Sequence, residues 1–253
     1  MVHFHHTKKL NAGFHRGTIA FFLATMLCSE SCIGIAAKER AWPSFLPAPS
    51  QVPNADIVKD VWENVTFERE VAAPLLNTPM PVYESIIDAP DILAAAANHL
   101  GLTEESAELA PDDGFELHGT DGSAAWYRVL LYEPQHRVIL SRGTLVVSGF
   151  RVKADVLGEL KISSSNELIR QNLKIFVHIK DPFLSSFAHF VFLFLPTIAD
   201  QELSRGFRLT HAVTTWAASD PDGFCLWLSS RPFTVRTRRV EHAVNCLAKE
   251  KVR

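Results

Sequence analysis

The stretch LIRQNLKIFVHI, residues 168–179, alternates between apolar and polar side chains, and this alternation decides the fold class. One set of alternate positions is apolar apart from Gln171, and its members are Ile169, Leu173, Ile175, Val177 and Ile179. The opposite set is mainly polar and contains Arg170, Asn172, Lys174 and His178. Successive side chains of a β-strand point to opposite faces of a sheet, so the pattern predicts a half-buried strand.

The preceding residues continue the same pattern, and we expect nearly all of Phe115 to Ile179 to be strand. Phe150, Val152, Ala154 and Val156 alternate with polar residues, and the alternation shifts at Leu157-Gly158 before it resumes with Leu160 and Ile162. Glycine inside a strand often marks a β-bulge, so we expect a bulge at Gly158.

Two further strands, WYRVLLYE (126–133) and HRVILSRG (136–143), are separated by Pro134-Gln135, which predicts a hairpin. Strands on short connections favour an antiparallel sheet with one face on the core and one face in water.

The stretch FLSSFAHFVFLFLPTI, residues 183–198, follows the predicted sheet. Phe183, Phe187, Phe190 and Phe194 have the i, i+4, i+7, i+11 spacing of one helix face. A helix between Pro182 and Pro196 would span only about 20 Å, which is short of a bilayer core of about 30 Å. We therefore expect this helix to pack against the sheet, with His189 as a hydrogen-bonded core residue.

The segment after this helix leaves two alternatives open. Residues 199–206 extend the helix, and residues 207–229 form either a hairpin with a turn at Asp220-Pro221-Asp222-Gly223 or a continuous helix that ends at Asp220.

The C-terminal residues predict a basic amphipathic helix. Val240, Val244 and Leu247 share one helical face. The flanking basic residues are Arg236, Arg238, Arg239, Lys249 and Lys251. Such a helix either docks on the domain or contacts an anionic lipid surface.

The segment before the sheet contains a strand candidate at Val82 to Ile87 and a helix candidate after it. Asp88 is a candidate helix cap, and Pro90 lies in the first turn. Ala94 to Ala97 favour helix, and Gly101 is a natural left-handed terminator. We expect a single α+β domain over 80–253.

The N-terminus has the layout of a secretory signal peptide over 1–37: basic residues (Lys8, Lys9, Arg16), an apolar run from Thr18 to Leu27, and small residues from Gly34 to Ala37. An uncleaved membrane anchor is the alternative. Residues 38–79 contain four closely spaced prolines, which predict a stiff tether, and a short helix at Ile57 to Val65.

Composition and cysteine content narrow the function. The 253 residues carry a net charge of -3, which gives no general basic field for nucleic acid. After removal of a signal peptide only Cys225 and Cys246 remain, and in an oxidising compartment they either form a disulfide or stay as two buried thiols.

The order of VYESIIDAP, DILAAAANHLG, an antiparallel meander and a long apolar helix resembles the START-like, or helix-grip, family of hydrophobic-ligand carriers, from Met80 to about Trp216. The resemblance implies a curved antiparallel sheet that wraps a long helix and encloses an apolar ligand or lipid. Ligand contacts would then come from Phe183, Phe187, Phe190, Phe194, Ile175 and Val177. The chain departs from the family pattern because it continues past the expected last helix.

Motifs for catalysis are scarce: the sequence lacks GxSxG, HExxH, Walker and CxxC motifs. We expect no metal and no cofactor. Arg205, Arg208 and His211 would share a helix face and are candidate contacts for an anionic head group. The predicted function is an exported binding or carrier protein for a hydrophobic small molecule. An enzyme on the same scaffold, cyclase- or hydrolase-like, and a protein-interaction domain without a cavity are the alternatives.

Overall fold

The computed structural model describes residues 40–110, 113–147, 150–165, 168–180, 195–232 and 234–246. All of them belong to one compact unit, Glu39–Arg253. The predicted signal peptide, the aromatic stretch from Phe183 to Phe194 with His189, and Leu247, Lys249 and Lys251 lie outside the described residues.

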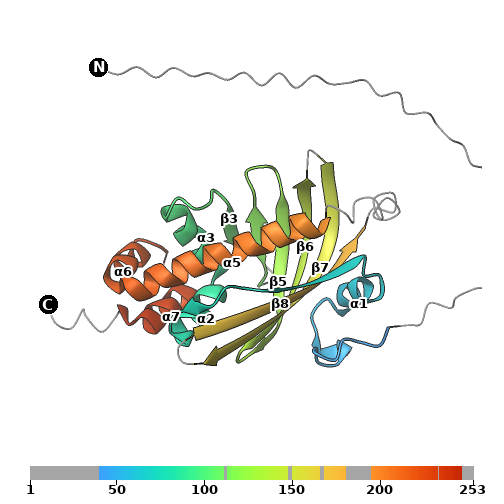
Figure 1. The fold of residues 1–253 in the computed structure, drawn as a ribbon, viewed down its shortest axis with the longest axis horizontal. Coiled ribbons are helices and arrows are strands. Elements are labelled where there is room, and N and C mark those ends of the chain that lie inside the picture. The colour runs from blue at the N-terminus through green and yellow to red at the C-terminus, as the bar shows by residue number, and fades with distance from the viewer. Residues whose placement is uncertain are drawn as a thin grey trace, which may run out of the picture. The chain divides into compact units, whose positions relative to one another are not determined.

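The described strands form one antiparallel sheet that curves around a long helix (Figure 1). The strands are β1 (Phe67–Ala72), β2 (Leu76–Asn77), β3 (Ser106–Leu109), β4 (Phe115–His118), β5 (Ala124–Glu133), β6 (His136–Val147), β7 (Phe150–Ser165) and β8 (Leu168–Ile179). Their order across the sheet is β1-β8-β7-β6-β5-β4-β3, and β2 also pairs with β8. The predicted antiparallel meander and the β5–β6 hairpin are confirmed.

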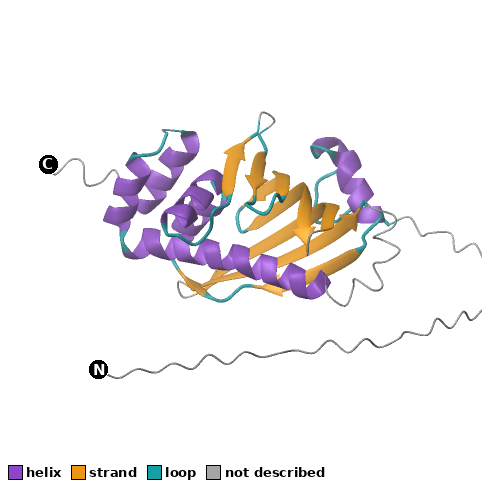
Figure 2. Cartoon of the chain, turned by 90° about the horizontal axis from the view of Figure 1, so that it is seen from above, coloured by secondary structure: helices purple, strands orange, loops and turns teal. Residues whose placement is uncertain are grey.

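The helices lie on both sides of this sheet (Figure 2). They are α1 (Ala55–Glu63), α2 (Met80–Ile87), α3 (Pro90–His99), α5 (Leu195–Ser219), α6 (Pro221–Ser229) and α7 (Val235–Val244), with a 3-10 turn at Pro49–Gln51. Helix α5 runs along the sheet, and α1 lies on the opposite side of it. This α+β, helix-grip-like architecture confirms the predicted fold class.

The face of the sheet toward α5, the inner face, carries the apolar positions predicted for strand 168–179. Ile175 and Val177 are buried and pack with Ala154 of β7 and Leu203 of α5. At one end of this face, Tyr83 of α2 packs with Leu76 of β2 and with strand residues of β7 and β8.

The opposite, outer face was expected to be wet, and this prediction is wrong at its centre. Val138, Leu140, Leu157 and Phe176 are buried there against residues that come before the sheet in the sequence. These covering residues are Leu46, Val52, Val58 and Val61, from α1 and the proline-rich segment before it. The proline-rich segment is therefore packed onto the sheet, and the expected stiff tether is not what the structure shows over residues 42–54. Its apolar residues Leu46 and Val52 are buried, and Trp42 and Phe45 are half-buried against the same cluster.

The predicted bulge at Gly158 is also wrong. Strand β7 pairs with β6 and β8 in unbroken register through Gly158, and the register shift of the sheet lies in β5, between Val129 and Leu131. The alternation of β7 never shifts, because the even-numbered positions stay on the inner face throughout. Leu157 is apolar because it belongs to the buried centre of the outer face.

Residues 82–87, predicted as a strand, belong to helix α2. The buried residues of α2 are Val82, Tyr83, Ser85 and Ile86, which is the spacing of a helix face. A short apolar run is ambiguous between strand and helix by periodicity alone. Asp88 does not cap α3; its carboxylate pairs with Arg137 of β6 instead.

Helix α3 begins with Pro90 and is terminated as predicted by Gly101. Gly101 has φ +68°, and its N–H donates to Asn98 while the N–H of Leu102 donates to Ala97. This pair of hydrogen bonds is the Schellman motif, which needs a left-handed residue at this place.

The continuous-helix alternative for residues 207–219 is correct, since α5 runs unbroken to Ser219. Asp220 then caps α6 by accepting a hydrogen bond from the N–H of Gly223. Helix α7 docks on the domain through Val240 and Val244, and Cys225 is joined to Cys246 by a disulfide. Within the described residues, no helix combines the length and apolar character that crossing a membrane requires.

Candidate functional site

The inner face of the sheet is the first candidate site, because the sequence analysis expected a ligand there. Of the predicted ligand contacts, Phe183, Phe187, Phe190 and Phe194 lie outside the described residues. Ile175 and Val177 do lie on the inner face and are buried, at 7% and 6% exposure. Their partners include Val152, Val156 and Leu173, so the two residues form a packed apolar floor.

Next to this floor, part of the inner face keeps apolar surface in reach of solvent. Val129 and Ile139 lie directly opposite each other on β5 and β6, and both are only half-buried. Among the described residues, neither joins one of the four clusters of buried apolar side chains. The neighbour of Ile139 on β7 is Gly158, which has no side chain to cover it.

Buried polar side chains close one end of the inner face. The Tyr83 hydroxyl donates to Oε1 of Gln171 at 2.7 Å, and Arg137 pairs with Asp88 at 3.0 Å between Nε and Oδ1. Burial raises the pKa of the Tyr83 hydroxyl, and the charge of Asp88 raises it further. Gln171, the polar exception in the predicted strand, is therefore explained by a tyrosine partner.

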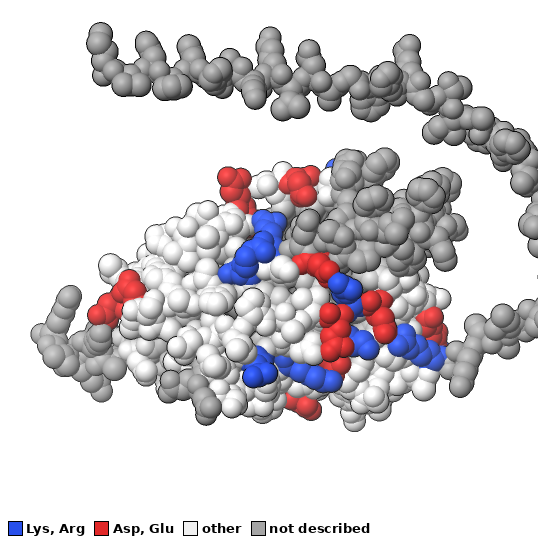
Figure 3. Space-filling model, in the orientation of Figure 1, with Lys and Arg blue, Asp and Glu red and all other residues white. Residues whose placement is uncertain are grey.

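The predicted head-group contacts lie on α5, as expected for one helix. Arg205 is held by Glu105, with 2.7 Å between Nη1 and Oε1, and it also donates to Thr103. Arg208 is exposed and His211 is half-buried. On the face that carries α5, the described residues show both signs of charge interspersed (Figure 3).

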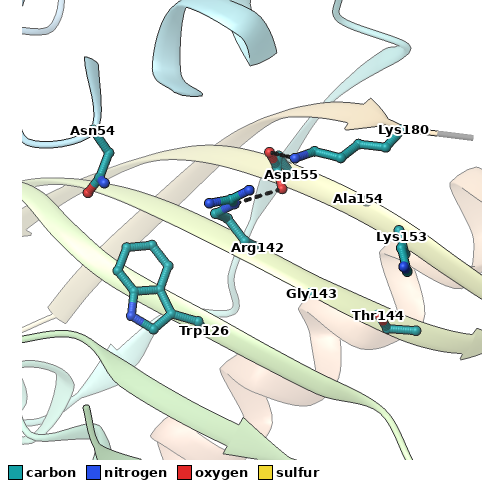
Figure 4. Close-up of a pocket in the computed structure, with 9 residues that line it drawn as sticks. All are labelled: Asn54, Trp126, Arg142, Gly143, Thr144, Lys153, Ala154, Asp155 and Lys180. Atoms are coloured by element: carbon teal, nitrogen blue, oxygen red, sulfur yellow. Dashed lines mark hydrogen bonds and ion pairs between the residues drawn. The ribbon is translucent and has the colours of Figure 1, made fainter. Parts of the chain in front are cut away.

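A second candidate site, which was not predicted from the sequence, is a pocket on the outer face. Its volume is about 420 Å³, within the range of roughly 300 to 1,000 Å³ common for small-molecule sites. The lining residues are Asn54, Trp126, Arg142, Gly143, Thr144, Lys153, Ala154, Asp155 and Lys180 (Figure 4).

Asp155 is the centre of this pocket's charge network. Its side chain is only 3% exposed and is paired with Nζ of Lys180 at 2.7 Å and with Nε of Arg142 at 3.4 Å. Arg142 lies directly opposite Asp155 in the sheet register, and Trp126 lies directly opposite Arg142. The alternation within each strand places Trp126, Arg142 and Asp155 on one face of the sheet. The pairing of these three residues across the strands could not be predicted from the sequence.

Among the residues that the structure describes, histidines do not gather in either site. His136 contacts Glu159 at 3.2 Å, with Lys161 on the same carboxylate, but these residues are on the outer face. His118 lies beside Glu116 at 3.6 Å, with both side chains about half exposed. The pairs His136–Glu159 and His118–Glu116 therefore do not lie at the inner-face candidate site.

Comparison with known proteins finds solved structures of low similarity and no family. No family model matches the chain, and no curated protein matches it. Among solved structures, a conserved protein from Geobacillus kaustophilus is 16% identical with a TM-score of 0.44, covering 60% of this chain and 95% of that one. Ara h 8.0201, a Bet v 1-like protein with a helix-grip fold, is 11% identical with a TM-score of 0.37, covering 58% and 95%. A protein from Thermus thermophilus is 10% identical with a TM-score of 0.37, covering 60% and 99%.

Proposed function

We propose that this protein is an exported carrier, START-like in its mode of binding, for a hydrophobic or lipid-like small molecule held against the inner face of the sheet. The observation that carries the proposal is the pair Val129 and Ile139, whose apolar side chains stay half-exposed between two strands of the concave face. Exposed apolar surface of this kind is unfavourable by about 25 cal/mol per Å² until something covers it.

The surroundings of this pair suit an apolar molecule. Ile175 and Val177 continue the apolar floor. Gly158, the neighbour of Ile139 on β7, has no side chain of its own to cover that residue. Arg208 and His211 on α5 remain the candidates for a polar head group, whereas the charge of Arg205 is already compensated by Glu105.

Native mass spectrometry of the protein purified from its own host tests the proposal directly. We expect one small apolar molecule to accompany the chain. Binding of a neutral apolar dye such as Nile red to the purified protein supplies a second readout, and absence of both a co-purified molecule and dye binding contradicts the proposal.

The substitution Ile139→Ala separates a binding surface from a packed core. At a binding surface it lowers dye binding and costs clearly less than the roughly 2 to 5 kcal/mol of a core truncation. Leu140→Ala is the matched control, because Leu140 is the next residue on β6, is fully buried, and faces the opposite side. It is expected to show the full core cost and unchanged dye binding.

Export is a separate part of the proposal and rests on the N-terminal sequence pattern. The mature chain is expected to begin near Ala37 or Lys38. N-terminal sequencing of the protein from the secreted or periplasmic fraction checks this, and an intact Met1 in the membrane fraction indicates an anchor instead.

A further inference from the structure

The outer-face pocket contains more positive than negative charge. Arg142, Lys153 and Lys180 line it, and Asp155 is the only acidic residue among the described residues that line it. A buried carboxylate needs compensation, and Lys180 and Arg142 provide it. Lys153 is exposed and forms no ion pair with the described residues. The described lining residues therefore carry two positive charges in excess.

The cations are placed to reach a ligand, whereas the carboxylate is not. The side chains of Arg142 and Lys180 are 44% and 36% exposed, but that of Asp155 is 3% exposed. Asp155 contacts Arg142 through Nε, which leaves the two terminal nitrogens of the guanidinium for a further acceptor. A guanidinium fork binds a carboxylate or a phosphate in bidentate fashion.

Two neighbouring features suit the same ligand class. Asn54 lines the pocket and is the N-cap residue of α1, so the N-terminal end of that helix, which favours anions, lies at the pocket. Beside Arg142, the indole of Trp126 offers a flat apolar surface for stacking.

We propose that this pocket is a binding site for a small aromatic anion, a carboxylate or phosphate group attached to a planar ring. Arg142 and Lys153 bind the oxyanion, Trp126 stacks on the ring, and Asp155 acts as a positioning residue that fixes Arg142 and Lys180. The site is on the face of the sheet opposite the proposed carrier surface, so the two are independent.

The test is a titration of the full chain with phenyl phosphate and, separately, with benzoate. Binding is followed by the NMR signal of the Trp126 indole N–H, assigned through a Trp126→Phe variant. We expect a saturable shift with at least one of the two probes, an affinity that falls as salt rises, and no shift with benzyl alcohol, which has the ring without the charge.

Two substitutions locate the oxyanion contacts. Lys153→Gln removes an exposed charge without an ion pair to the described residues, and Arg142→Lys keeps the charge beside Asp155 but removes the fork. Each is expected to weaken binding about tenfold, the effect of one charge-assisted hydrogen bond. Arg170→Gln, an exposed outer-face residue on β8, is the matched control and leaves binding unchanged.

Three outcomes overturn the proposal. They are the absence of a saturable shift with both probes at millimolar concentration, binding that is unchanged in both Lys153→Gln and Arg142→Lys, and binding of inorganic phosphate as tight as that of phenyl phosphate. The last result shows an anion site in which the ring and Trp126 contribute nothing.

Discussion

At the scale of single residues, buried polar side chains tie the helices to the inner face of the sheet. The side chains of Arg137 and Asp88 are 4% and 5% exposed, and Tyr83 is 1% exposed with Gln171 as its partner. Each of these groups is satisfied by a residue far away in sequence, which is why Asp88 was predicted as a helix cap and Gln171 as an unexplained exception. Local sequence shows that a residue is polar but not which distant residue compensates it.

The Tyr83–Gln171 hydrogen bond gives a stability prediction. Tyr83→Phe leaves the amide of Gln171 buried without its partner, so the free energy of unfolding is expected to fall by about 1 to 3 kcal/mol. Adding Gln171→Leu removes the orphaned polar group and is expected to restore part of that loss. Urea unfolding of the wild type, of each single variant and of the double variant measures the coupling, and strictly additive losses from the two substitutions contradict it.

The tyrosines of the inner face also predict a dependence on pH. Burial raises the pKa of Tyr83 and Tyr127 in the folded chain, and nearby acidic residues raise it further, whereas a tyrosine in the unfolded chain ionises near 10.0. Their contribution to stability is therefore fully present below pH 10 and is lost as the pH rises above it. Each is expected to lower the free energy of unfolding by up to about 1.4 kcal/mol per pH unit there.

Urea unfolding at a series of pH values above 9 checks this alkaline loss. The variant with both Tyr83→Phe and Tyr127→Phe is expected to show a flatter fall than the wild type, with each single variant in between. An unchanged pH slope in the double variant would show that other groups cause the loss.

At the scale of elements, the long strands were predictable because their alternation extends over many residues. The strand over residues 168–179 and the hairpin through Pro134-Gln135 were found in this way. Helix α2 was not, since residues 82–87 are too few to separate a period of 2 from one of 3.6. Strand β7 has apolar residues on both faces near Gly158, and this was wrongly interpreted as a shift caused by a bulge. The helix that buries Leu157 on the outer face comes from a distant part of the chain, so its presence there could not be predicted locally.

The disulfide between Cys225 of α6 and Cys246 after α7 predicts how the C-terminal helices respond to reduction. Closing a loop of 21 residues is worth about 3 kcal/mol in the chain-entropy model. Cys225→Ala with Cys246→Ala is expected to lose about that much free energy of unfolding. Dithiothreitol should destabilise the wild type and leave the double variant unaffected, and two alkylatable thiols in the native oxidised protein would rule the bridge out.

At the scale of the whole molecule, helices and loops pack on both faces of the sheet, and those on the outer face come from residues that the sequence suggested were a tether. Prolines obscured this, because a proline-rich stretch is also typical of a stiff linker. The candidate sites were less predictable than the fold. The inner face could be predicted from the alternation, whereas the outer pocket depends on the register of β5, β6 and β7 and on Asn54 and Lys180 from outside these strands.

Truncation tests the role of this cover. A chain that begins at Met80 lacks β1, β2 and α1, and it exposes Phe176 and Leu157 on the outer face together with one edge of β8. Burial of Leu46, Val52, Val58 and Val61 contributes on the order of 1.5 to 3 kcal/mol each as an upper bound, which is comparable to the roughly 5 to 15 kcal/mol of net stability of a domain. The truncated chain is therefore expected to lose cooperative unfolding and near-ultraviolet circular dichroism, whereas a chain that begins at Glu39 keeps both. Cooperative urea unfolding of residues 80–253 would show instead that the sheet and its C-terminal helices are sufficient, and that the cover on the outer face is dispensable.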